Sequence, residues 1–212
     1  MRVAVFGATG GIGRLVVERL RLEGHDVVAY IRNPATLASD PPRLEVVVGQ
    51  LSERSQVTRA VRGADAVISA LGPSLRLGSR GTPVADGTRA IVSAMADVGV
   101  RRYVGLATTS IPDVRDRRTV RARATPLVAR LVFPNAVTEL VGMSAAVTGA
   151  DLDWTVARIT NPTNQPARGT LRVGFLGRDQ VGWSMSRADI AAFLVGQLGD
   201  RAYVGSAPVI SN

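Results

Sequence analysis

The chain contains no cysteine and no lysine, because all 26 of its basic residues are arginine. Without cysteine it can form neither a disulfide framework nor a thiolate site. Without lysine it cannot be a Schiff-base enzyme, a P-loop nucleotide hydrolase of the usual kind, or a dehydrogenase that needs lysine beside its tyrosine. The single histidine, His25, cannot build a site of several histidines, so we expect no metal.

Aromatic residues and long apolar runs are also scarce. Aromatics make up 4% of the chain, too few for a platform on which nucleic-acid bases stack. No apolar run approaches the roughly 18 residues that suggest a membrane span. The N-terminal stretch reaches its glycines too early to resemble a secretory signal. We therefore expect a cytoplasmic protein with neither a membrane nor a nucleic-acid partner.

The net charge is +9, and six of the arginines lie between residues 113 and 130. Arginine here is best interpreted as the general surface cation of this chain. The alternatives are a basic surface that attracts an anionic substrate, or a nucleic-acid site. The segment 110–133, interrupted by Pro112 and Pro126, fits the surrounding pattern poorly, and we interpret it as a lid on the substrate side.

Short apolar runs alternate with helical patterns along the rest of the chain. Helix signals include Ser52 with Gly63, the Thr82–Pro83 pair, and Ser186. Strands are expected at 2–7, 26–31, 44–50, 65–72, 101–109 and 152–159, and helices at 12–24, 52–63, 82–100, 134–149 and 186–198. This order predicts an α/β fold: one Rossmann-type, doubly wound domain over 1–212, with a mostly parallel sheet and helices on both faces.

Four glycines, Gly7, Gly10, Gly11 and Gly13, separate the first strand from the first helix. Glycine allows a tight turn there and a close approach of the backbone to a ligand. The helix N-terminus adds free N–H groups and a partial positive charge, which together favour a pyrophosphate. Thr9 could add a hydroxyl. The sequence therefore predicts dinucleotide binding.

The second strand ends in Arg32, where sites that prefer NAD usually carry an acidic residue. A guanidinium pairs with a 2′-phosphate, whereas a carboxylate would repel it. We therefore expect NADP(H), with NAD(H) as the less favoured cofactor.

With these features the chain resembles the NmrA-like, NAD(P)H-binding group of atypical short-chain dehydrogenases/reductases, which includes flavin reductase/biliverdin reductase B. The resemblance runs nearly end to end. It is carried by "FGATGGIG", "IRNP", "VVVGQL", "ADAVISALG", "DLDWTVAR" and "SRADIAAFL". The group often has aspartate where this chain has Gln50.

The resemblance implies a set of cofactor-binding residues grouped by the part of the dinucleotide that they meet. For the pyrophosphate these are Gly7, Thr9, Gly10, Gly11, Ile12 and Gly13; for the 2′-phosphate Arg32, followed by Asn33; for adenine Gln50 and Leu51; for the ribose and nicotinamide side Ala70, Leu71 and Gly72. The resemblance also places the hydroxyl of Thr108 near the nicotinamide and residues 159–162 over its face.

The chain has three tyrosines, Tyr30, Tyr103 and Tyr203, but no Tyr-x-x-x-Lys pair. Alcohol–ketone chemistry by that route is therefore excluded. Reduction of a planar acceptor asks only for orientation and a dry pocket, since the cofactor supplies the hydride and water the proton. We predict an NADPH-dependent reductase acting on a flavin, a quinone or a tetrapyrrole-like acceptor, with Thr108 as the catalytic hydroxyl. The alternative for Thr108 is a strand-end hydroxyl that bonds the backbone.

Two other functions remain open. An NmrA-like protein can bind NADP(H) as a redox sensor without turnover. A tailoring reductase or isomerase of secondary metabolism would act on a larger acceptor, shaped by the segments near 110–133 and 159–185. Nothing in the pattern forces a stable oligomer, so we expect a monomer or a weak homodimer.

Overall fold

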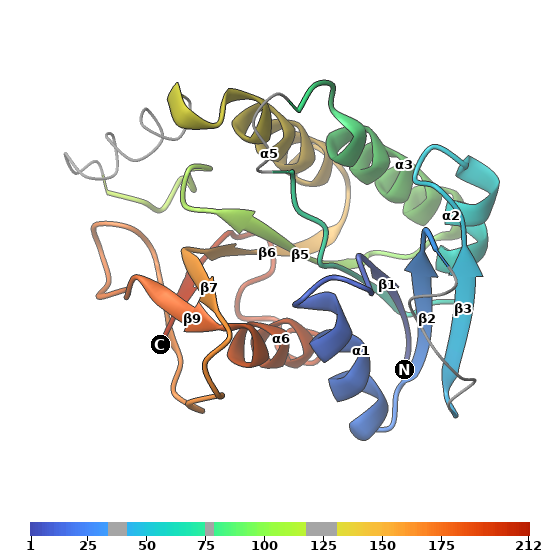
Figure 1. The fold of residues 1–212 in the computed structure, drawn as a ribbon, viewed down its shortest axis with the longest axis horizontal. Helices are drawn as coiled ribbons and strands as arrows, with labels where there is room; N and C mark the ends of the chain where they lie inside the picture. The colour runs from blue at the N-terminus through green and yellow to red at the C-terminus, as the bar shows by residue number, and fades with distance from the viewer. Residues whose placement is uncertain (34–41, 75–78, 118–130) are drawn as a thin grey trace.

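In the computed structural model, which describes residues 1–33, 42–74, 79–117 and 131–212, a twisted sheet lies between two layers of helices (Figure 1). Its eight strands are β1 (Arg2–Phe6), β2 (Asp26–Ile31), β3 (Leu44–Val48), β4 (Ala66–Ser69), β5 (Arg102–Thr108), β6 (Asp153–Ile159), β8 (Arg172–Gly174) and β10 (Val209–Ser211). Their order is β3-β2-β1-β4-β5-β6-β10-β8, and only the pairing of β10 with β8 is antiparallel. A separate pair joins β7 (Asn161–Thr163) to β9 (Ser184–Ser186).

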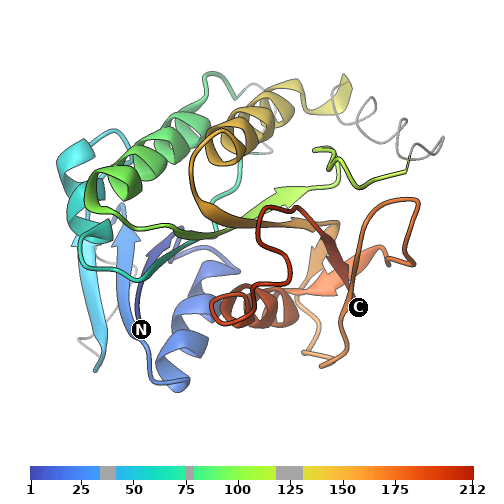
Figure 2. The same ribbon diagram turned by 180° about the vertical axis from the view of Figure 1, so that it is seen from behind.

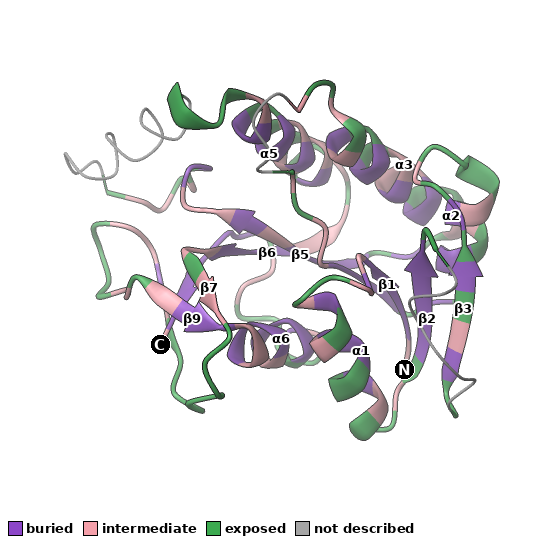
Figure 3. Ribbon diagram, in the orientation of Figure 1, coloured by how far each residue is buried: buried purple, intermediate pink, exposed green. Residues whose placement is uncertain are grey.

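The helices cover both faces of the sheet (Figures 1 and 2). On one face lie α1 (Gly13–Leu22) and α6 (Arg187–Gly196); on the other lie α2 (Arg54–Val61), α3 (Pro83–Val98) and α5 (Pro134–Thr148). Each layer buries its own apolar core against the central strands, which are buried along their length (Figure 3). The predicted Rossmann-type, mostly parallel α/β fold is confirmed.

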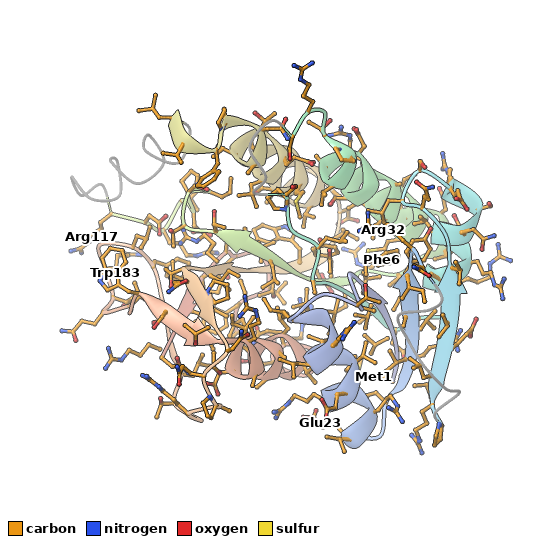
Figure 4. All side chains as sticks on the ribbon, viewed as in Figure 1. Met1, Phe6, Glu23, Arg32, Arg117 and Trp183 are labelled. Atoms are coloured by element: carbon orange, nitrogen blue, oxygen red, sulfur yellow. The ribbon has the colours of Figure 1, made fainter. Side chains whose placement is uncertain are left out.

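The strand order reverses between β1 and β4, and this reversal positions the site. Crossovers on the two sides of the reversal lead away in opposite directions, which leaves a crevice at the carboxyl ends of these strands. Phe6, the last residue of β1, pairs with Tyr30 on one side and Ser69 on the other. In Figure 4, Phe6 and Arg32 lie at this edge, whereas Met1 and Glu23 lie at the opposite edge.

Most helix ends follow the predicted signals. The Oγ of Ser186 accepts a hydrogen bond from Asp189 N at 3.0 Å, and Pro83 begins α3 after Thr82. The prediction of Ser52 as the cap of α2 is wrong, because the helix begins at Arg54 with Glu53 as its cap residue. Glu53 N closes a turn onto Gln50 O at 2.8 Å, which places the helix start one residue later.

The C-terminal third contains three-residue strands that the sequence pattern did not predict: β7, β8, β9 and β10. They extend the sheet beyond β6 and form the small second sheet. The proposed lid, 110–133, falls largely on 118–130, outside the described residues, as do most of its arginines. Among the helices of the described ranges, none is long and apolar enough to cross a membrane.

Candidate dinucleotide-binding site

The glycine loop joins β1 to α1 at the predicted crevice. The chain turns at Gly7, whose φ of +77° is the left-handed conformation that glycine adopts freely. Gly10 N donates to Gly7 O at 3.0 Å and closes the turn. A Cβ on Gly13 would lie 2.0 Å from Gly7 O, so only glycine lets α1 pack this closely on β1.

The first turn of α1 lacks a neutralising side chain among the described residues. Ile12 is the cap residue, no side chain caps the helix, and its first turn holds no acidic residue. The N–H groups of such a turn point outward and carry a partial positive charge. Gly10 and Gly11 are exposed and Thr9 is half-buried, so a ligand can approach the loop. This arrangement is suited to a pyrophosphate.

Arg32 and Asn33 follow β2 and are exposed. Among the described residues, no carboxylate lies within ion-pair distance of the Arg32 guanidinium. An exposed cation therefore stands beside the glycine loop, at the strand end where the 2′-phosphate of NADP was predicted (Figure 4).

The residues predicted for adenine lie at the end of β3. Gln50 is exposed, and its backbone oxygen accepts a hydrogen bond from the Tyr30 hydroxyl at 2.7 Å. Leu51 is half-buried and packs so closely on α3 that a Cβ on Gly87 would lie 2.5 Å from its Cδ1. Gln50 therefore faces the edge, while Leu51 mainly fixes the loop.

The residues predicted for the ribose and nicotinamide side follow β4. Ala70 N donates to Phe6 O at 2.9 Å, and a Cβ on Gly7 would lie 2.9 Å from the Ala70 carbonyl. Leu71 packs partly on the core and Gly72 is exposed. The backbones after β1 and β4 are thus in close contact at the switch point.

Hydroxyl groups gather at the ends of β5 and β6. The Thr108 and Ser110 hydroxyl oxygens are 2.6 Å apart, so Thr108 bonds this side chain. Thr160 follows β6, and its buried Oγ1 has no hydrogen-bond partner in the described part of the chain. A buried hydroxyl without a partner costs free energy.

Two of the three tyrosines are buried, and their phenols are poor acids. Burial is the main reason that the pKa of Tyr30 and that of Tyr103 each rise to about 12. Tyr203 contacts Phe193 of α6, with ring centroids 6.2 Å apart.

The sequence reasoning missed Arg158, which is fully buried near the end of β6. Its guanidinium pairs with both carboxylate oxygens of Asp116, at 2.6 and 2.8 Å. It also donates to the backbone oxygens of Ile111, at 3.1 Å, and Ala207. The described start of the 110–133 segment is thereby attached to the sheet beside the candidate site.

Arg187, the first residue of α6, was also missed. Its Cδ and Nε lie 3.2 Å from the position that a Cβ on Gly11 would occupy. Its Nη1 donates to Asn164 Oδ1 at 2.6 Å. One side chain therefore spans from the glycine loop to the segment after β7. Only the folded arrangement brings these residues together, since 176 positions separate Gly11 from Arg187 in the sequence.

The residues at this edge fit a nicotinamide dinucleotide. The glycine loop offers uncapped amides, Arg32 offers a cation at one end, and the hydroxyls of Thr108, Ser110 and Thr160 lie toward the other. Gly7 and Gly13 have no room for a side chain, which keeps the loop close to the sheet. The individual ligand contacts remain predictions.

Comparison with known proteins agrees with this geometry. A family model described as NAD(P)H-binding matches residues 7–201. The (4-alkanoyl-5-oxo-2,5-dihydrofuran-3-yl)methyl phosphate reductase of Streptomyces griseus is 33% identical over 57% of this chain and 40% of its own length. The chain thus spans less than half the length of that curated relative.

Two solved structures share the fold over the whole chain. ChuY, an anaerobilin reductase of Escherichia coli O157:H7, has a TM-score of 0.80 at 20% identity, with 97% of that chain covered. A short-chain dehydrogenase/reductase of Veillonella parvula, solved in complex with NADP, has a TM-score of 0.76 at 16% identity, with 94% of that chain covered.

Proposed function

This chain belongs to the NAD(P)H-binding family, and on that premise we propose that it is an NADPH-dependent reductase that passes hydride to a planar acceptor. The observation that carries the choice of NADPH is Arg32, an exposed guanidinium at the end of β2 without a carboxylate neighbour among the described residues. The reductase names of the S. griseus relative and of ChuY support the reaction class.

The chain's own residues have three tasks in this proposal. The amides of the glycine loop hold the pyrophosphate and Arg32 holds the 2′-phosphate. The hydroxyl pair of Thr108 and Ser110 orients the nicotinamide or donates to the acceptor. The bound cofactor supplies the hydride.

The acceptor class follows from the missing proton donor. The chain has no lysine. Burial raises the pKa of Tyr30 and that of Tyr103 to about 12, so neither phenol releases its proton readily. A flavin, a quinone or a linear tetrapyrrole suits such a site, because the proton that follows the hydride can come from water. The competing functions, a redox sensor and a tailoring reductase, share the cofactor residues and differ in turnover and in acceptor.

The test follows the nicotinamide absorbance of NADPH and NADH with FMN, a quinone and biliverdin as acceptors. We expect acceptor-dependent oxidation that favours NADPH. Arg32→Gln should weaken NADPH binding about 10- to 100-fold and leave NADH nearly unchanged, because it removes a charge-assisted bond to a group that only NADPH carries. The matched control is Arg62→Gln, an exposed arginine at the end of α2, on the opposite edge of the sheet.

Equal losses for both cofactors in Arg32→Gln would contradict its role as the selector. Tight NADPH binding without oxidation by any of these acceptors would favour the redox sensor. Thr108→Val should lower turnover with little effect on NADPH binding.

A further inference from the structure

The side chain of Arg187 lies next to the glycine loop. It contacts the neutral Asn164 Oδ1, and no carboxylate of the described ranges lies within ion-pair distance of it. The nearby carboxylate of Asp189 already accepts hydrogen bonds from Arg168 N, Gly169 N, Ser186 Oγ and Asn212 Nδ2. Within the part of the chain that the structure describes, the charge of Arg187 therefore has no counter-charge.

Arg187 is the first residue of α6, whose own N-terminus is capped by Ser186 and holds the carboxylate of Asp189 in its first turn. Its side chain reaches Gly11, two residues before the N-terminus of α1. The guanidinium therefore lies beside the N-terminus of α1, whose first turn has neither an acidic residue nor a side-chain cap. A guanidinium and a helix N-terminus next to each other both attract an anion.

We infer that Arg187 is a second anion-binding residue of the dinucleotide site, and that its guanidinium exchanges Asn164 for the pyrophosphate of the bound dinucleotide. The inference rests on the proposed dinucleotide binding, and it adds a residue from α6 to a site otherwise built at the carboxyl ends of β1 to β6. A guanidinium suits this role because it forms strong charge-assisted bonds to phosphate oxygens.

The consequence for ligand choice differs from that of Arg32. The pyrophosphate is common to NADPH, NADH and ADP-ribose, so Arg187 should strengthen all three alike. Adenosine 2′-monophosphate has no pyrophosphate and should be insensitive to Arg187, while remaining sensitive to Arg32. Binding of these small ligands therefore distinguishes the role of Arg187 from that of Arg32.

The experiment measures the affinities of ADP-ribose, NADPH and adenosine 2′-monophosphate by titration calorimetry, without any acceptor. Arg187→Gln should weaken ADP-ribose and NADPH about tenfold and leave adenosine 2′-monophosphate unchanged. It should also reduce the dependence of ADP-ribose affinity on salt. Arg62→Gln removes the same charge at the opposite edge and controls for the net charge.

Asn164→Ala separates a binding role of Arg187 from a structural one. It removes the contact in the free protein but keeps the guanidinium, so it should retain at least the wild-type affinity for ADP-ribose. If it weakens ADP-ribose as much as Arg187→Gln does, the bridge to Asn164 is structural and the inference is wrong. Thermal unfolding of each variant identifies losses that come from misfolding.

The inference and the proposed function fail in different ways. If the wild-type protein binds NADPH and ADP-ribose and Arg187→Gln binds both equally well, only the inference is overturned. If the wild-type protein binds neither, dinucleotide binding itself is wrong, and the inference is overturned with it.

Discussion

At the scale of the residue, the pair of Arg158 and Asp116 shows how an ionic contact can be kept inside the fold. Arg158 is fully buried, and the side chain of Asp116 is 11% exposed. Asp116 also accepts hydrogen bonds from Leu176 N and Asp113 N. Burial raises the pKa of Asp116, but the bonds from Arg158 and these amides outweigh it, so this pKa lies below its ordinary value.

Asp116→Asn should lower the free energy of unfolding by about 3 to 5 kcal/mol at neutral pH, since it leaves a buried cation without its counter-charge. Because the folded pKa is depressed, the ionised carboxylate stabilises the fold above its unfolded pKa of about 4, and this contribution is lost as the pH falls through the folded pKa. The difference between wild type and variant should therefore shrink in acid. Urea unfolding across this pH range measures it.

The control for Asp116 is Asp97→Asn, which breaks the exposed pair with Arg54. That pair should contribute less than about 1 kcal/mol at any pH. A loss at Asp116 as small as the loss at Asp97 would show that solvent reaches the buried pair.

At the scale of the element, α5 is attached to the start of α3 through Glu139. This glutamate is 2% exposed, and its Oε2 accepts from Val84 N at 3.0 Å and Ala85 N at 2.7 Å. These N–H groups belong to the first turn of α3, where no side chain of the helix itself provides a cap. A carboxylate at this place is favoured by the helix dipole as well.

Glu139→Gln keeps an acceptor and loses the charge, so it should cost about 1 kcal/mol; Glu139→Ala leaves both amides unpaired and should cost about 2 to 3 kcal/mol. Hydrogen exchange at Val84 and Ala85 should accelerate in the same order. Glu18→Gln, on the exposed side of α1, serves as the control. Unchanged exchange at these amides in Glu139→Ala would mean that another group caps α3.

At the scale of the whole molecule, stability should decrease from the centre of the sheet to its edges. All of β4 and most of β1 are completely buried, whereas Val46 and Val48 of the edge strand β3 are 37% and 42% exposed. Native-state hydrogen exchange should therefore be slowest in β1, β4 and β5 and faster in β3 and β8. Equal protection of β3 and β4 would instead indicate a single opening unit.

Most elements of the whole fold could be predicted from the sequence. The first six strands and the helices between them have local signals, namely apolar runs, caps and terminal glycines, and the structure confirms them. The glycine loop was predictable for the same reason. The strands β7 to β10 have three residues each, too few for a periodicity to appear.

The missed residues of the candidate site depend on contacts between distant parts of the chain. Arg158 lies in an apolar strand, and its burial makes sense only with Asp116, 42 positions earlier. The contact of Arg187 with the glycine loop likewise depends on how α6 packs beside α1. No local pattern carries such information, so neither residue could be assigned from sequence.

The bonds of Arg158 also set an order for biosynthesis. Its guanidinium donates hydrogen bonds to Ile111, Asp116 and Ala207. The last of these acceptors lies 49 residues after Arg158 in the sequence. As the chain leaves the ribosome, the glycine loop and its first strands are complete long before that acceptor is made. Until residue 207 emerges, the Nε of this arginine lacks its acceptor, and β10 cannot yet pair with β6.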